Sequence, residues 1–129
     1  MADKSTVLIV DDNAANIMWL YNLLKSEYKC IVAKSGIDAI NSAANNSPDI
    51  ILLDVVMPDM DGYEVISLLK KDSSTKDIPV IFITGLDDDK NEAKGLALGA
   101  ADYIKKTSDG EEAKLRIREQ LQMRGSKRV

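Results

Sequence analysis

The sequence contains no histidine and a single cysteine, and these two shortages exclude several classes of site. Without histidine there can be no Ser-His or Cys-His catalytic pair, no histidine general base and no histidine metal ligand. Cys30 alone cannot form an internal disulfide or the thiolate cage of a structural zinc site. This cysteine usage is typical of a reducing compartment, so we expect a cytoplasmic protein.

Long apolar runs are also missing. The stretch from Val7 to Val10 is too short for the core of a signal peptide, and two acidic residues follow it directly. No run approaches the ~18 apolar residues that a membrane-spanning helix needs. We therefore expect neither a targeting segment nor association with a membrane.

The charge balance is mildly acidic, with 17 Lys and Arg against 21 Asp and Glu and a net charge of −4. A surface of this sign does not attract nucleic acid or an anionic bilayer, so we expect no direct nucleic-acid binding. The length of 129 residues and the 45% hydrophobic content are typical of one globular domain. We assign this domain to residues 1–124 and treat the polar, basic residues 125–129 as a tail or the start of a linker.

Short apolar runs alternate with segments of helical length along the whole chain. Several of these runs are apolar at nearly every residue, which is typical of strands buried on both faces. The expected strands are Thr6 to Val10, Cys30 to Ala33, Ile50 to Leu53, Val80 to Ile83 and Ala101 to Ile104. The expected helices are Ala14 to Ser26, Gly36 to Asn45, Gly62 to Lys71, Lys90 to Leu98 and Gly110 to Met123. This order predicts an α/β fold whose parallel sheet is covered by helices on both faces.

Polar residues follow four of the predicted strands, at the sheet edge where an open α/β fold binds its ligands. They are Asp11 and Asp12 after the first strand, Asp54 after the third, Thr84 after the fourth and Lys105 after the fifth. Each of them alone also fits ordinary turn, cap or surface chemistry. Their joint occurrence at successive strand ends indicates one small site.

Carboxylates that converge repel one another and therefore need a cation. Oxygen ligands without histidine or cysteine favour a hard ion such as Mg²⁺, which prefers a phosphate partner. A lysine ammonium at Lys105 and the hydroxyl of Thr84 both suit phosphoryl oxygens. Asp54, at the end of the central strand, is the best placed nucleophile for an aspartyl phosphate.

At these residues the sequence resembles the response-regulator receiver family, the phosphoacceptor domains of two-component signalling. The resemblance extends from Val7 to about Leu121. It rests on the pair Asp11-Asp12, on Asp54 with the loop Met57-Pro58-Asp59-Met60-Asp61-Gly62, on Thr84-Gly85, and on Gly99-Ala100-Ala101-Asp102-Tyr103-Ile104-Lys105. It implies a flavodoxin-like, doubly wound (βα)5 fold with a five-stranded parallel sheet in the order 2-1-3-4-5.

The resemblance also implies a function. Asp54 would accept a phosphoryl group from the phosphohistidine of a sensor histidine kinase or a histidine phosphotransfer protein. The implied Mg²⁺ ligands are Asp11, Asp12, Asp54 and the carbonyl of Val56. Thr84 and Lys105 would bind the phosphoryl oxygens, and Tyr103 would follow Thr84 in switching the interaction surface. Such a domain is not an enzyme, since it catalyses only its own phosphorylation and dephosphorylation.

One departure from the family lies at the end of the fifth predicted strand. There the chain has Lys105-Lys106-Thr107 in place of the usual Lys-Pro-Phe. A cis bond without proline costs ~2.5–4 kcal/mol, so we expect a trans bond between Lys105 and Lys106, with the Lys105 side chain still reaching Asp54. The departure leaves one alternative open, a receiver-fold interaction module that is not phosphorylated.

Five consecutive apolar residues, Ile17-Met18-Trp19-Leu20-Tyr21, lie in the first predicted helix. At about 100° per residue they encircle the helix, whereas a core-facing stripe is only somewhat wider than ~100°. Some of these side chains must therefore face water. We expect Met18 and Trp19 to form a partner surface close to Asp54.

Overall fold

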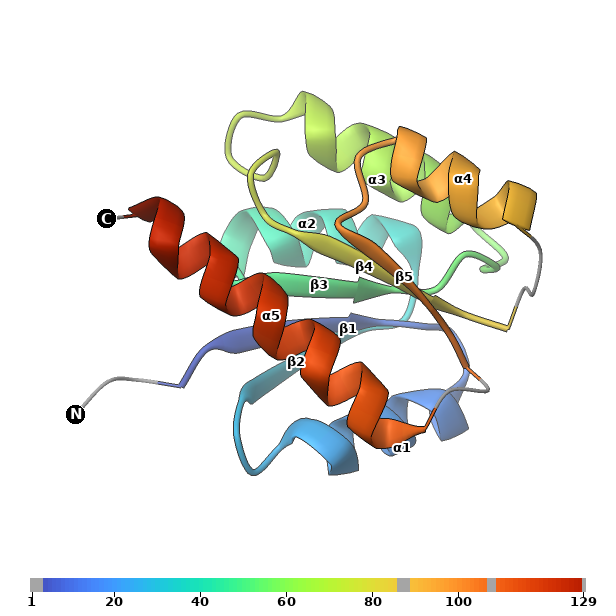
Figure 1. The fold of residues 1–129 in the computed structure, drawn as a ribbon. Helices are drawn as coiled ribbons and strands as arrows, with labels where there is room; N and C mark the ends of the chain where they lie inside the picture. Colours follow the sequence, from blue (N-terminus) through green and yellow to red (C-terminus); the bar gives the residue numbers. More distant parts are fainter. Residues whose placement is uncertain (1–3, 86–88, 107–108, 129) are drawn as a thin grey trace.

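The computed structural model describes residues 4–85, 89–106 and 109–128 (Figure 1). Within these residues five strands and five helices alternate, as predicted. The strands are β1 (Thr6–Val10), β2 (Lys29–Ala33), β3 (Ile50–Leu53), β4 (Val80–Thr84) and β5 (Asp102–Lys105). The helices are α1 (Ala14–Leu24), α2 (Gly36–Asn46), α3 (Gly62–Lys71), α4 (Asp89–Ala97) and α5 (Gly110–Arg128).

The strands form one parallel sheet in the order β2-β1-β3-β4-β5, which confirms the predicted flavodoxin-like topology. Helices α2, α3 and α4 cover one face, and α1 and α5 cover the other (Figure 1). The chain reverses its direction of winding between β1 and β3. The carboxyl ends of these two strands therefore mark the crevice in which such folds bind ligands.

The buried strands divide their side chains between two apolar layers, because successive residues of a strand point to opposite faces. Leu8, Leu53 and Phe82 belong to the layer under α2, α3 and α4. The neighbouring Ile9 and Leu52 belong to the layer under α1 and α5. The prediction of strands buried on both faces is confirmed.

Helix ends follow the capping residues of the sequence. The side chains of Ser35 and Asp61 each accept a hydrogen bond from the backbone N–H three residues on, at the first turns of α2 and α3. Helix α2 ends at Asn46 and is capped by Ser47, which adopts a left-handed conformation with φ of 45°. Gly99, with φ of 110°, follows α4 in a backbone conformation that favours glycine.

Several element ends differ from the prediction. Helix α1 ends at Leu24 rather than Ser26, β2 begins at Lys29 rather than Cys30, and β4 ends at Thr84 rather than Ile83. Helix α2 ends at Asn46 rather than Asn45, and α4 covers Asp89–Ala97 rather than Lys90 to Leu98. Strand β5 covers Asp102–Lys105 rather than Ala101 to Ile104, so it ends one residue later. Helix α5 continues to Arg128 instead of ending at Met123, since the residues around Gly125 are mostly good helix formers. Among the described residues, no helix combines the length and the apolar character that crossing a membrane requires.

Candidate functional site

Three carboxylates converge at the carboxyl ends of β1 and β3. Asp11, Asp12 and Asp54 each offer an oxygen atom, and these atoms lie within 4.8 Å of one another. Asp11 and Asp54 are buried, whereas Asp12 is exposed. The sheet's hydrogen bonds continue as far as the two buried residues, since the Asp11 and Asp54 N–H groups donate to the carbonyls of Ala33 and Val10. The predicted aspartates are thus brought together, two of them on a rigid backbone.

The cluster favours a cation. The pKa of Asp54 is raised to about 6, because burial and, less strongly, the nearby Asp11 carboxylate raise it by more than Lys106 lowers it. A hard divalent ion fits this set of oxygen ligands, because the repulsion and the lost hydration of the carboxylates are relieved by its charge. The three residues therefore suit Mg²⁺.

The ammonium group at the site belongs to Lys106. Its Nζ lies 3.1 Å from Oδ2 of Asp11 and 3.4 Å from Oδ1 of Asp54. We expected Lys105 in this place, and the structure corrects that assignment by one residue. Among the described residues, both ion pairs of the buried carboxylates are made with Lys106.

The alternation of side chains along β5 explains the correction. Tyr103 belongs to the layer under α2, α3 and α4, and Ile104 to the layer under α1 and α5. Lys105 therefore shares the side of Tyr103, while Lys106 continues the side of Ile104. Asp54 follows Leu53 of the first layer, so it also continues on the side of α1 and α5. Following the alternation of side chains along β3 and β5 in the sequence would have identified Lys106 as the lysine on the same side as Asp54.

The backbone holds Lys106 in this register. Its N–H donates to the Thr84 carbonyl at 2.8 Å, which extends the ladder in which Thr84 pairs with Lys105. The bond between Lys105 and Lys106 is trans, as predicted. With Lys106 as the lysine of the motif, Thr107 takes the place of the family's proline, and Thr107 lies outside the described residues.

Thr84 and Tyr103 lie on the other side of the sheet end. Thr84 is the last residue of β4 and is buried. The Tyr103 ring is also buried, with its centroid 6.0 Å from that of Phe82. Helix α4 packs closely here, because a Cβ on Gly95 would lie 2.9 Å from Phe82. Both predicted residues thus lie on the face of the sheet that α4 covers.

The loop from Val55 to Asp61 leads from Asp54 into α3. At its base the Gly62 N–H donates to the Val55 carbonyl at 2.7 Å. A Cβ on Gly62 would overlap the Asp54 carbonyl and would lie 2.9 Å from the Val55 Cα, so only glycine allows this close approach. Val56, whose carbonyl is a predicted metal ligand, is 60% exposed on this loop.

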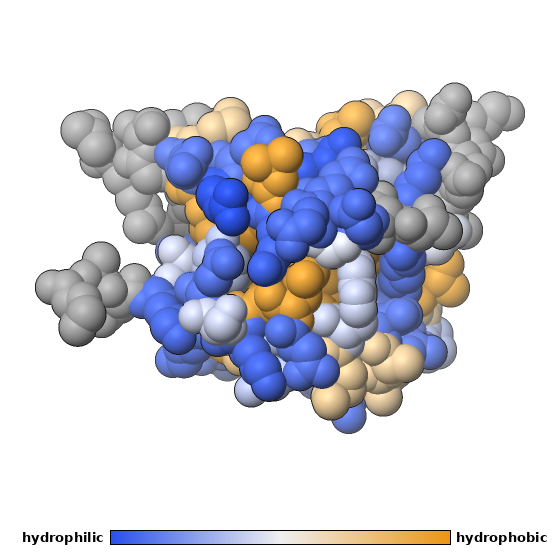
Figure 2. All heavy atoms as spheres, turned by 60° about the horizontal axis from the view of Figure 1, so that its bottom comes forward, coloured by the Kyte–Doolittle hydropathy of each residue, from blue (hydrophilic) through white to orange (hydrophobic). Residues whose placement is uncertain are grey.

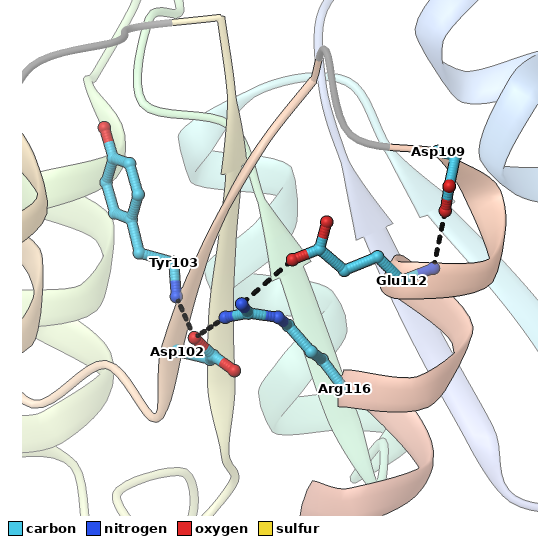
Figure 3. A network of polar contacts seen from close by, with 5 residues as sticks. All are labelled: Asp102, Tyr103, Asp109, Glu112 and Arg116. Atoms are coloured by element: carbon cyan, nitrogen blue, oxygen red, sulfur yellow. Dashed lines mark hydrogen bonds and ion pairs between the residues drawn. The ribbon is translucent and has the colours of Figure 1, made fainter.

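Polar contacts hold the two elements on either side of Lys106, β5 and α5, in place (Figure 3). Oδ1 of Asp102 accepts from Arg116 Nη1 at 2.7 Å and from the Tyr103 N–H at 2.8 Å. The other Arg116 nitrogen lies 2.9 Å from Glu112, whose own N–H donates to Asp109 at 2.9 Å. These contacts tie the start of β5 to α5 and cap the helix that follows the site.

Helix α1 presents several of its apolar side chains to water. Ile17 and Leu20 are buried in the core, whereas Met18, Trp19 and Tyr21 are exposed, Met18 by 56%. The prediction that some of the five residues face water is confirmed. Figure 2, which brings forward the underside of Figure 1, shows apolar patches between hydrophilic side chains.

A cavity of about 280 Å³ lies between α1 and the carboxyl-end side of the sheet. Asn16, Trp19 and Leu20 line it from the helix, and Ile83 and Lys106 line it from the sheet. Trp19 and the site lysine therefore border the same hollow.

The chain resembles known proteins over nearly its whole length. The model of the response regulator receiver domain matches residues 7–118. A probable cyclic di-GMP phosphodiesterase of Vibrio cholerae is 41% identical over 126 residues, which are 98% of this chain and 29% of that protein. Response regulator PleD of Caulobacter vibrioides is 44% identical over 107 residues, 82% of this chain and 24% of PleD. The chain thus spans less than a third of either relative.

Shorter relatives and solved structures match over most of their own length. Protein PilH of Pseudomonas aeruginosa is 36% identical over 81% of this chain and 88% of PilH. A putative response regulator from Chloroflexus aurantiacus superposes with a TM-score of 0.88 at 30% identity, over 92% of this chain and 98% of the other. A CheY-like receiver domain from Methanospirillum hungatei gives 0.89 at 25% identity, over 97% and 99%. The family match, the sheet order and the acidic cluster agree, and the chain belongs to the response regulator receiver domain family.

Proposed function

We propose that this domain is the phosphoacceptor of a phosphorelay. Asp54 accepts a phosphoryl group from the phosphohistidine of a sensor histidine kinase or a histidine phosphotransfer protein, with Mg²⁺ as cofactor. The observation that carries the proposal is the arrangement around Asp54, a buried carboxylate with two acidic neighbours and an ammonium 3.4 Å away. The solved receiver domain of DrrB, a structural relative at 27% identity, is described as BeF3-activated.

The chemistry assigned to these side chains is nucleophilic transfer. A carboxylate oxygen of Asp54 attacks phosphorus, the bond from phosphorus to the donor's imidazole nitrogen breaks, and the imidazole leaves with the bonding electrons. Lys106 and Thr84 are proposed to bind the oxygens of the transferred phosphoryl group, whose negative charge an ammonium and a hydroxyl stabilise. Lys106 replaces Lys105 in this role.

Mg²⁺ would be held by four oxygen ligands and would supply positive charge that stabilises the transferred phosphoryl group. The proposed ligands are Asp11, Asp12, Asp54 and the Val56 carbonyl. Lys106 balances part of the negative charge of the two buried carboxylates, which keeps the pKa of Asp54 from rising further.

The domain is proposed to act as a switch, since the phosphoryl group stays on its own carboxylate after the donor imidazole has left. Tyr103 and Thr84 are the proposed switch residues, on the side of the sheet that α4 covers. The proposed location is the cytoplasm. The assigned partners are proteins, with neither nucleic acid nor membrane bound directly by this domain.

The proposed docking surface for the phosphodonor is formed by Met18 and Trp19 on α1. Both side chains are exposed, and Trp19 lines the cavity that Lys106 also borders. Exposed tryptophan is typical of binding hot spots. A donor imidazole that approaches Asp54 from this side meets an apolar surface next to the reacting group.

The test is labelling of the purified protein by a small phosphodonor in the presence of Mg²⁺, followed by measurement of the intact mass. The wild type should gain one phosphoryl group, and chelation of Mg²⁺ should prevent the gain. Asp54→Asn keeps the shape of the side chain, removes the nucleophile and should gain none. A folded wild type that takes no label under these conditions would support the unphosphorylated interaction module instead.

A further inference from the structure

Asp59 links the loop after Asp54 to the start of α2, a helix on the same face of the sheet as α3. Its two carboxylate oxygens accept from the Gly36 N–H at 3.2 and 3.1 Å, and one of them also accepts from the Ile37 N–H at 3.3 Å. Gly36 and Ile37 are the first two residues of α2. A residue of the β3–α3 loop thus caps a helix that precedes it by more than twenty positions.

This capping is separate from the local cap of α2. Ser35 accepts from the Asp38 N–H, the third of the unpaired donors at the helix start, and leaves the first two to Asp59. The hydrogen bond from Gly36 is the largest cause that lowers the pKa of Asp59, so its carboxylate is ionised at neutral pH. The negative charge also faces the positive end of the helix dipole.

The loop is in close contact with α2 at the next residue as well. A Cβ added to Gly36 would lie 2.8 Å from the Met60 Cβ, so Met60 rests directly on the start of the helix. At the other side the loop is closed by the bond from the Gly62 N–H to the Val55 carbonyl. Val56 lies between these two attachments.

We infer that Asp59 is a positioning residue for the metal site: by fixing the loop to the start of α2, it holds the Val56 carbonyl where a divalent cation needs it. The inference rests on the proposed function, in which that carbonyl is a ligand. Groups that orient metal ligands through hydrogen bonds typically change metal affinity 10- to 100-fold when removed.

The experiment compares Asp59→Ala with Ser35→Ala by titration calorimetry of Mg²⁺ binding. Ser35→Ala is the matched control, because it removes a cap from the same helix without touching the loop. Asp59→Ala should weaken Mg²⁺ binding about 10-fold, whereas Ser35→Ala should leave it at the wild-type value. Asp59→Asn, which keeps one acceptor oxygen and loses the charge, should fall between them.

Amide hydrogen exchange without metal gives a second readout. Exchange at the Gly62 amide, which closes the base of the loop, should become faster in Asp59→Ala and in Asp59→Asn but not in Ser35→Ala. If Asp59→Ala does not fold, Asp59→Asn carries both measurements.

The outcomes separate the two levels of the proposal. A wild type that binds Mg²⁺ together with Asp59 variants of unchanged affinity and unchanged Gly62 exchange would overturn the role of Asp59 alone. Equal weakening by Ser35→Ala would overturn it too, since the effect would then come from the stability of α2. A wild type that binds no Mg²⁺ would overturn the proposed metal site and, with it, this inference.

Discussion

The carboxyl ends of β3 and β5 bring opposite charges to one site, but they are built differently. β3 is a central strand whose residues are all buried, and Asp54 is followed by a loop that Gly62 closes against it. β5 lies at the edge of the sheet, and its last residue, Lys105, is followed by a second lysine. The end of β3 offers one candidate carboxylate, Asp54. The end of β5 offers two candidate lysines, Lys105 and Lys106, which differ in the side of the sheet that they face.

The largest expected effect separates these two lysines. Lys106→Ala should slow phosphorylation by a small phosphodonor about 10²-fold or more at saturating Mg²⁺, because the group that stabilises the transferred charge is lost. Lys105→Ala, the matched control, should retain a rate close to that of the wild type. Initial rates of labelling measure both. A larger loss in Lys105→Ala would return the role to the residue that we first assigned.

The second prediction concerns Asp54 and pH in the absence of Mg²⁺. The raised pKa of about 6 means that, between pH 4 and 6, the native state binds more protons than the unfolded chain, whose aspartate pKa is 3.8. Stability should therefore fall as pH rises through this window, by about 3 kcal/mol from this residue, and then level off. Urea unfolding in chelator should show about 2 kcal/mol of this decline between pH 4.5 and 7.5, because pH 4.5 already lies above the unfolded pKa.

Asp54→Asn supplies the control for that measurement, because an amide does not titrate. The variant should lose most of the decline with pH and should be more stable than the wild type at pH 7.5 without metal. A decline of the same size in Asp54→Asn would show that other groups cause it.

The third prediction tests the tight loop at the end of β3. Gly62→Ala should lower the free energy of unfolding by about 1–3 kcal/mol, since the added methyl group meets backbone atoms of Asp54 and Val55. Gly85→Ala, at the end of β4, is the matched control because nothing lies within 4 Å of its added Cβ. Denaturant unfolding of both variants should show a clear loss only for Gly62→Ala. Equal stabilities would mean that the loop adapts to a side chain.

The smallest expected effect on stability comes from a substitution on the exposed surface of α1. Trp19→Ala should change stability little but should slow phosphoryl transfer from a phosphorylated histidine phosphotransfer protein several-fold. Labelling by a small phosphodonor should stay unchanged, because the reacting groups are intact. Leu68→Ala, an equally exposed side chain on α3, is the control. An equal effect of the two substitutions on transfer would contradict a docking surface on α1.

Much of this architecture is predictable from the sequence, because strands buried on both faces leave apolar runs that turns and caps separate. Asp54 is predictable for the same reason, since it directly follows the four apolar residues of β3. The assignment at β5 was wrong because strand length was judged by hydrophobicity, which ends at Ile104, whereas backbone pairing with β4 extends through Lys105. The hydrogen bond from the Gly36 N–H to Asp59 joins segments that are distant in the sequence, and no local sequence pattern predicts it.

The most direct test of the central claim is to locate the phosphoryl group chemically. Wild-type protein labelled with a small phosphodonor and Mg²⁺ is treated with borohydride, which reduces an aspartyl phosphate to homoserine, and the peptides are then sequenced by mass spectrometry. We expect homoserine at position 54 and unmodified aspartate at Asp11 and Asp12. Homoserine at either of those positions, or its absence from the whole chain, would contradict it.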